Sequence, residues 1–123
     1  MRFIKTLIIA VITTLLMACG SSPQSTLNDF YRSTEAGDIT KAYSLCSSNM
    51  HQMLGEQKLK LALGSIHDQI KAKGGIKDIK IKGEPDKEIA NLELTITYGS
   101  GRIETGKENL VLENGQWKID SKM

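Results

Sequence analysis

The sequence is poor in cysteine, in net charge and in long apolar runs, and each shortage excludes a class of protein. Its 123 residues include 2 cysteines and carry a formal net charge of +2, which gives neither a zinc-type cysteine spacing nor a strongly basic chain. The longest apolar run, residues 7–16, is about half of the ~20 residues that a membrane-spanning helix needs. The sequence also shows no internal repeat, no phosphate-binding glycine loop and no recognisable Ser-His-Asp set.

The N-terminus contains the three parts of an export signal. Arg2 and Lys5 form a charged start, residues 7–16 form the apolar part, and the small residue Ala18 precedes an expected cleavage point. A polar stretch at 20–25 then ends the apolar run. We therefore expect residues 1–18 to be a signal peptide that is removed from the mature protein.

Leu16-Met17-Ala18-Cys19 resembles the lipobox of bacterial lipoproteins. The resemblance implies cleavage before Cys19, a diacylglycerol on its thiol and an acyl chain on its new amino group, which together suffice for stable membrane anchoring. Gly20 stands where a signal for inner-membrane retention would have Asp, which favours the outer membrane of a Gram-negative cell. The protein would face the periplasm, with exposure at the cell surface as an alternative. An ordinary secretory signal followed by a chance cysteine is the other interpretation.

Removal of residues 1–18 changes the charge of the chain. It takes away Arg2 and Lys5 and leaves acidic and basic residues in equal number, so global charge gives no reason to expect a nucleic-acid partner. A lysine-rich stretch remains at 71–87. Because it has no interleaved aromatic residues, a solvated face is the favoured interpretation, and an anion-binding patch, for example for lipid headgroups, is the alternative.

Cys46 has no cysteine partner in the mature chain once Cys19 is assigned to the lipid. Cys46 recurs with Ile39, Ala42 and Leu45 at helical spacing, which predicts a small apolar residue on a buried helix face. In an oxidising compartment an intermolecular disulfide is the alternative. Catalysis is less favoured, because Cys46 is expected toward the end of its helix, away from the N-terminal end that would lower a thiol pKa.

The first half of the mature chain has the 3.6-residue periodicity of helices. We expect helices over residues 26–36, 39–47 and 55–73. A pattern like a capping box begins the first helix at Thr26, and Gly37 ends it. Asp38 caps the second helix, and Gly74-Gly75 provides a left-handed exit from the third.

From residue 76 the period changes to two, as in half-buried strands. We expect strands over residues 79–82, 89–98, 102–112 and 116–120. The third strand is expected to be bulged near Gly106, and Asn114-Gly115 is typical of a tight type I′ hairpin turn. The pattern predicts one α+β domain over residues 26–123, after the lipidated cysteine and a tether at 19–25. Its three helices would pack on one face of a curved four-stranded antiparallel sheet.

A set of residues spread over the mature chain carries a further resemblance. The set consists of Phe30, Gly37-Asp38, Lys41-Ala42, Gly75, Ala90 and the terminal Asn114-Gly115-Gln116-Trp117-Lys118-Ile119. It resembles small bacterial lipoproteins of the nuclear-transport-factor-two-like, or cystatin-like, superfamily, and more narrowly an uncharacterised domain family related to lumazine-binding-like lipoprotein domains. The resemblance implies a cone whose open end can hold a small apolar ligand or a partner segment, and a sheet that can serve for dimerisation.

We therefore expect a lipid-anchored, non-enzymatic binding or interaction module of the cell envelope, without a cofactor. Its pocket is expected to be bounded by Phe30, Tyr31, Tyr43, Leu63, Leu94, Ile96, Tyr98 and Trp117. The occupant would be a small apolar molecule or a segment of an envelope protein. The alternative is an assembly protein whose cone is filled by its own side chains and which forms a homodimer through an apolar sheet face.

Catalysis is a third candidate, because the superfamily includes isomerases and dehydratases. Their sites resemble an Asp or His base that works with Tyr or Asp hydrogen-bond donors inside the cone. The residues of suitable type are Asp29, Tyr31, Tyr43, His67 and Tyr98. No spacing among them requires a shared pocket, so we do not expect an enzyme.

A soft-metal site is also conceivable at Met50-His51-Gln52-Met53. Two thioethers and an imidazole would suit copper. A single cluster of this kind falls short of a well-defined site, and the segment equally suits an apolar linker between two helices. We therefore expect no metal.

Overall fold

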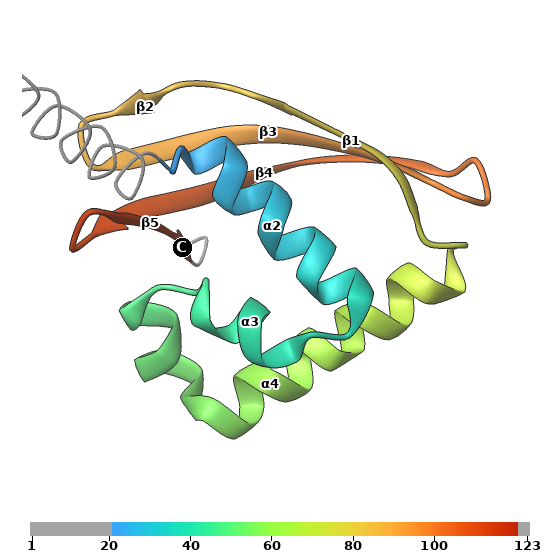
Figure 1. Ribbon diagram of the computed structural model, residues 1–123, viewed down its shortest axis with the longest axis horizontal. Helices are drawn as coiled ribbons and strands as arrows, with labels where there is room; N and C mark the ends of the chain where they lie inside the picture. Colours follow the sequence, from blue (N-terminus) through green and yellow to red (C-terminus); the bar gives the residue numbers. More distant parts are fainter. Residues whose placement is uncertain (1–20, 121–123) are drawn as a thin grey trace, which may run out of the picture.

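The computed structural model describes residues 21–120 of the chain. The expected signal peptide, the lipobox and Cys19 lie outside the described residues. Within 21–120, none of the helices is long and apolar enough to span a membrane. Residues 21–120 form three helices followed by five strands, and Figure 1 shows how these elements are arranged. This order confirms the predicted α+β fold class.

The first helix, α2 (Pro23–Ala36), begins earlier than the sequence pattern indicated. Ser22 is its N-cap, because its Oγ accepts a hydrogen bond of 3.0 Å from a backbone N–H of the first turn. Pro23 suits the first turn, where its missing N–H would have no helical partner. The start predicted at Thr26 is therefore wrong, and residues 23–25, which were expected in a tether, belong to the helix. Gly37 ends the helix as predicted, with a φ of 81°.

The second helix, α3 (Ile39–Ser44), is shorter than predicted. Asp38 caps it as expected, by accepting a backbone hydrogen bond of 3.2 Å. The chain leaves the helix because backbone hydrogen bonds of 2.7 and 2.8 Å join residues 47 and 45 to Ile119. Cys46 therefore lies in an extended segment and not on a helix face, although it is buried as predicted.

The third helix, α4 (Ser48–Ala72), starts well before the predicted residue 55. Ser47 is its N-cap, and its Oγ accepts a hydrogen bond of 3.2 Å from a backbone N–H of the first turn. Gly55 interrupts the helix with φ 78° and ψ 162°, a conformation that glycine adopts readily. Residues 50–53, for which an apolar linker was the alternative, thus belong to a short helical piece before this kink. Gly74 and Gly75 have φ values of 92° and 80°, as predicted for the exit.

The strands form one antiparallel sheet in the order β1-β3-β4-β5, and β2 pairs with β3 as well. Their bounds are β1 Ile76–Lys82, β2 Pro85–Asp86, β3 Ile89–Tyr98, β4 Ile103–Glu113 and β5 Gln116–Asp120. The prediction of four strands missed β2. This strand has two residues, which is too short for an alternating pattern to show in the sequence.

The pairing of β3 with β4 is regular along its whole length, so the bulge predicted near Gly106 is wrong. The register shift lies instead in β1, between Ile76 and Asp78. The predicted hairpin turn is present, since Asn114 and Gly115 have φ values of 52° and 78°, as a type I′ turn requires.

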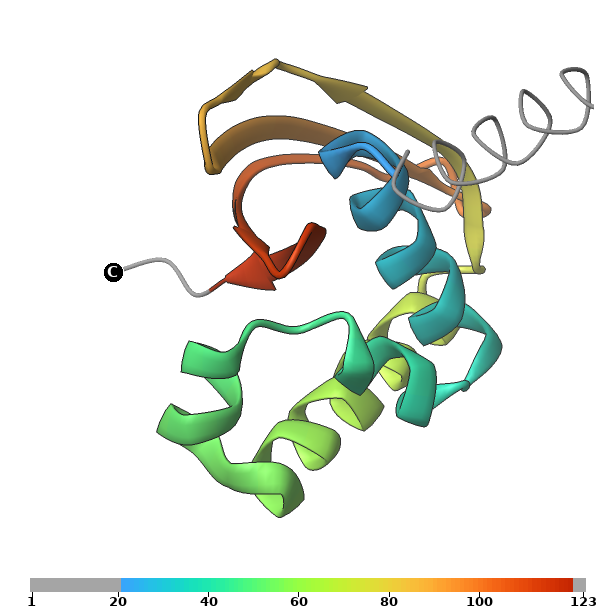
Figure 2. The ribbon, with the colours of Figure 1, turned by 60° about the vertical axis from the view of Figure 1, so that its left-hand side comes forward.

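The helices cover one face of the sheet. α2 packs against β1 and β5, and α3 and α4 pack against α2. Figure 2 shows the sheet curving around α2, with β5 curled toward the helices. The inner face of β3 is buried and consists of Ala90, Leu92, Leu94, Ile96 and Tyr98. The segment around Cys46 covers the outer edge of β5, which would otherwise be open for pairing.

Candidate functional site

An apolar pocket of about 330 Å³ lies between α2, α4 and the last two strands. The helix α4 supplies most of its wall, through Met50, Leu54, Leu59, Ala62, Leu63 and Ile66. The helix α2 adds Phe30 and Tyr31, and the sheet adds Glu108, Ile119 and Asp120. The pocket therefore combines an apolar wall with a few polar groups, as small-molecule sites do.

Tyr31 and Glu108 form the main polar contact of this pocket. The Tyr31 hydroxyl donates a hydrogen bond to Oε2 of Glu108 across 2.8 Å. Glu108 faces the helices because it pairs with the buried Leu92, and opposite residues of paired strands share a face. Burial, followed by the charge of Glu108, raises the pKa of the Tyr31 phenol well above its usual range. The phenol thus remains a hydrogen-bond donor at neutral pH.

The second carboxylate at the pocket belongs to Asp120. Its Oδ1 accepts a hydrogen bond of 2.6 Å from the hydroxyl of Ser47. The same Ser47 oxygen accepts from a backbone N–H of α4. Ser47 is fully buried, so this contact ties the start of α4 to the end of β5 beside the pocket.

Three of the eight residues predicted to bound the pocket line it, namely Phe30, Tyr31 and Leu63. The rings of Phe30 and Tyr31 meet edge to face, with centroids 5.3 Å apart and an angle of 89° between the planes. Phe30 is buried, whereas Tyr31 is half-buried and reaches toward β4.

The other five predicted residues lie elsewhere. Leu94, Ile96 and Tyr98 belong to the buried inner face of β3, and Trp117 is buried on β5. Tyr43 lies on α3, where its ring stacks on His51 with centroids 4.1 Å apart. The prediction assumed that inward-facing aromatic and aliphatic residues would border a cavity, but most of them fill the core.

The sequence pattern did hold a signal for Glu108, which we missed. Alternate positions of β4 that lead to the buried Leu110 point inward, and Glu108 is the preceding member of that series. A charged residue in the inward register of a strand is unusual and indicates a partner or a site. Asp120 and Met50 gave no such signal, because their places depend on how the start of α4 meets the end of β5.

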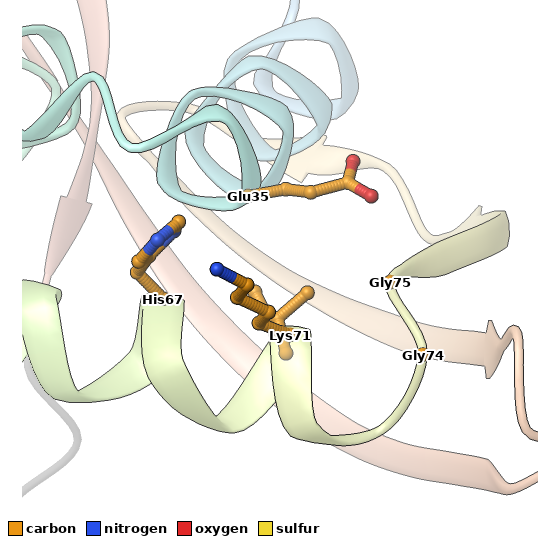
Figure 3. A pocket seen from close by; sticks show the side chains of 6 residues that line it. Glu35, His67, Lys71, Gly74 and Gly75 are labelled. Carbon is orange, nitrogen blue, oxygen red and sulfur yellow. The ribbon is translucent and has the colours of Figure 1, made fainter.

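A second and more polar pocket, of about 520 Å³, lies between the C-terminal ends of α2 and α4. Figure 3 shows His67 and Lys71 projecting from α4 toward α2, which carries Glu35. Nδ1 of His67 lies 2.9 Å from the carbonyl oxygen of Thr34, and Oε2 of Glu35 accepts a hydrogen bond of 2.8 Å from the Ile76 N–H. These groups join α2 to α4 and to β1, so a structural role accounts for them.

No family model matches the chain, and no curated protein matches it. The chain is similar to a solved structure from Campylobacter jejuni, described provisionally as an NTF2-like transpeptidase. The TM-score is 0.70, the sequence identity is 18%, and the match covers 83% of this chain and 100% of the other. The fold is NTF2-like.

At this identity the likeness shows the fold alone. It agrees with the fold that the sequence resemblance implied, while the relation to lumazine-binding-like lipoprotein domains stays a prediction. The solved chain is matched over its whole length, and the buried core of this chain lies between Leu27 and Ile119. The buried core of the described residues therefore lies within a single NTF2-like fold.

The NTF2-like fold does not bring the residues weighed for catalysis together. Tyr31 lines the apolar pocket, His67 lies at the more polar pocket, and Asp29 is exposed on α2. Tyr98 donates a hydrogen bond of 3.2 Å to Oε1 of Glu104, and neither residue lines the apolar pocket. No base and donor pair of the expected kind forms among these residues.

The residues considered for copper binding also make contacts that differ from one residue to the next. Nε2 of His51 lies 2.8 Å from the carbonyl oxygen of Tyr43, Met50 lines the apolar pocket, and Sδ of Met53 accepts a hydrogen bond from Asn49. Among residues 21–120, no group of three or more His, Cys, Asp and Glu side chains is placed to hold a metal ion.

Proposed function

We propose that the protein is a lipid-anchored component of the cell envelope whose pocket binds a small apolar ligand without chemical change. The observation that carries this proposal is the apolar pocket of about 330 Å³ between α2, α4 and the sheet. Ligand pockets are concave, mostly apolar and equipped with a few polar groups that orient the ligand. The wall of α4 side chains and the contact between Tyr31 and Glu108 fit that description.

The outer face of the sheet supports ligand binding over assembly. This face of β3 and β4 consists mainly of Asn91, Glu93, Thr95, Thr97, Thr105, Lys107 and Asn109. Ile89 and Ile103 are 54% and 63% exposed, but they stand at opposite ends of the β3–β4 pairing. A stable dimer through the sheet would need a continuous apolar patch, and two separated isoleucines do not make one.

The N-terminal sequence supports the anchor. Cys19 precedes the start of α2 at Pro23 by four residues, and an extended chain spans about 3.5 Å per residue. An acylated Cys19 would thus hold the domain within about 14 Å of the bilayer surface. A ligand that partitions between membrane and protein would have a short path to travel.

We do not expect catalysis in this pocket, for a chemical reason. Isomerases that use an enolate need hydrogen-bond donors aimed at a developing negative charge. In this pocket the Tyr31 hydroxyl already donates to Glu108, so a substrate oxygen would have to displace that carboxylate to receive the donor.

Native mass spectrometry of residues 20–123, purified from a periplasm without refolding, tests ligand binding. We expect an added mass that disappears on denaturation. Ala62→Trp, which places a large ring in the wall of the pocket, should abolish the adduct, whereas Ala72→Trp at the exposed end of α4 should keep it. A domain that carries no adduct and binds no apolar probe would overturn the proposal.

A further inference from the structure

The charged groups that line the apolar pocket are carboxylates, which accept hydrogen bonds. Glu108 and Asp120 contribute carboxylates, and the lining residues include no Lys, Arg or His. The donors nearby are already used. The Tyr31 hydroxyl donates to Glu108, and the Ser47 hydroxyl donates to Asp120.

Glu108 has hydrogen-bonding capacity left over. Its Oε2 accepts from Tyr31, whereas its Oε1 accepts nothing from the other residues at 21–120. Glu108 is half-buried and stands at the inner face of the sheet. A carboxylate that is partly withdrawn from water gains most from a donor that carries positive charge.

This polarity decides which ligand would suit the pocket. A fatty acid or another carboxylate would bring a second negative charge toward Glu108 and would find no free donor among the lining side chains. An uncharged apolar molecule would leave Oε1 of Glu108 without a partner while covering it from water, which costs free energy.

We propose that the ligand class is a cationic amphiphile, an apolar body that bears a protonated amine which donates a hydrogen bond to Glu108. This inference deepens the proposed function and rests on it. The apolar body lies against Leu59, Leu63 and Ile66 of α4, and the ammonium group meets the carboxylate at the inner face of β4.

Isothermal titration of residues 20–123 at pH 7 with octylamine, 1-octanol and octanoate tests the inference. The three probes share one chain and differ in the head group. We expect octylamine to bind about tenfold more tightly than octanoate, with octanol between them. Glu108→Gln should reduce the preference for the amine to about threefold or less, because the amide cannot form an ion pair.

Matched variants make the result specific. Glu93→Gln removes a carboxylate from the outer face of the same sheet and should leave the order of the probes unchanged. Tyr31→Phe frees Oε2 of Glu108 for the ammonium group and should increase the preference for octylamine over octanoate. Circular dichroism of each variant verifies that it is folded.

The outcomes separate the two proposals. If octanoate binds as tightly as octylamine, the inference of a cationic head group is wrong. It is also wrong if the preference for octylamine remains in Glu108→Gln. Either result would leave the proposal of apolar ligand binding in place. If none of the three probes binds and the native protein carries no adduct, the proposed function itself is wrong, and the head-group inference is wrong with it.

Discussion

Gly99 lies so close to Gly74 that a Cβ on Gly99 would overlap the carbonyl oxygen of Gly74. The contact joins the end of α4 to the β3–β4 hairpin. Two backbone hydrogen bonds accompany it, from the Gly99 N–H to the Gly75 oxygen at 2.8 Å and from the Ser100 N–H to the Lys73 oxygen at 3.0 Å. At this point the helical half and the sheet half of the domain therefore contact each other through backbone atoms.

Gly99→Ala should destabilise the protein by about 1–3 kcal/mol, because the added methyl group forces this contact apart. Gly106→Ala is the matched control, since a Cβ at Gly106 meets nothing within 4 Å and should change stability by about 0.5 kcal/mol or less. Urea unfolding of both variants measures the difference. Equal stability of the two would show that the hairpin can move away without cost.

The sequence predicted elements where local chemistry is sufficient. Alternation along residues 89–98 identified β3, and Asp38 and Gly37 marked helix ends by their own backbone preferences. The end of α3 at Ser44 was not predictable in this way, because it depends on hydrogen bonds to Ile119, which is distant in the sequence. The helix start expected at Gly55 is a kink within a longer helix.

The same distinction applies to the site. Phe30, Tyr31 and Leu63 were found because they lie on apolar helix faces that must be buried somewhere. Periodicity cannot tell which buried residues border a void and which fill the core, and so Leu94 and Ile96 were included wrongly among the lining residues. The inward position of Glu108 could have been predicted from the alternation of β4, because Glu108 lies two residues before the buried Leu110.

Tyr31→Phe should destabilise the protein by about 1 kcal/mol, because it removes a partly buried hydrogen bond to a charged acceptor. Glu108→Gln keeps an acceptor and should cost a similar amount or less. In the double variant the losses should not add, since both changes act on the same contact. A double-mutant cycle in urea checks this, and strictly additive losses would mean that the two side chains do not interact in solution.

Glu104 should make the protein sensitive to acid. Its Oε2 lies 2.8 Å from Lys73 Nζ and 3.1 Å from Arg102 Nε. The hydrogen bond from Lys73 is the main cause that lowers the pKa of Glu104 below its ordinary value of 4.5. A lowered pKa in the folded state means stability that is present above about pH 4.5 and is lost as pH falls through the lower value.

Glu104→Gln should therefore be less stable than the unmodified protein at pH 7, by about 1 kcal/mol at most because solvent screens the network. The difference should shrink as pH falls below 4.5. Unfolding curves from pH 7 to pH 3 measure it, with Glu84→Gln in the exposed segment before β2 as the control. If the difference in stability between Glu104→Gln and the unmodified protein stays constant down to pH 3, the ion pairs of Glu104 with Lys73 and Arg102 do not stabilise the fold as proposed.

Cys46 should be unreactive in the folded protein. It is 1% exposed, and burial raises the pKa of its thiol to about 11. In residues 20–123 it is the sole cysteine, so the absorbance change with a disulfide reagent reports on it alone. We expect the native rate at pH 8 to be at least about a hundredfold below the rate in urea. A disulfide-linked dimer on a non-reducing gel would instead favour the intermolecular bond.

Cys19 should carry the lipid, and this can be tested independently of the pocket. Cells that express the full chain and are fed an alkyne-tagged palmitate should label the protein, and fractionation should place it with the membranes. Cys19→Ser should abolish both the label and the membrane fraction, because the lipid is attached through this residue. Cys46→Ser is the matched control, and its label should remain, since Cys46 is buried in the fold. A released, unlabelled protein from the unmodified gene would instead indicate an ordinary secretory signal, and the ligand would then have to be sought in solution and not at a membrane.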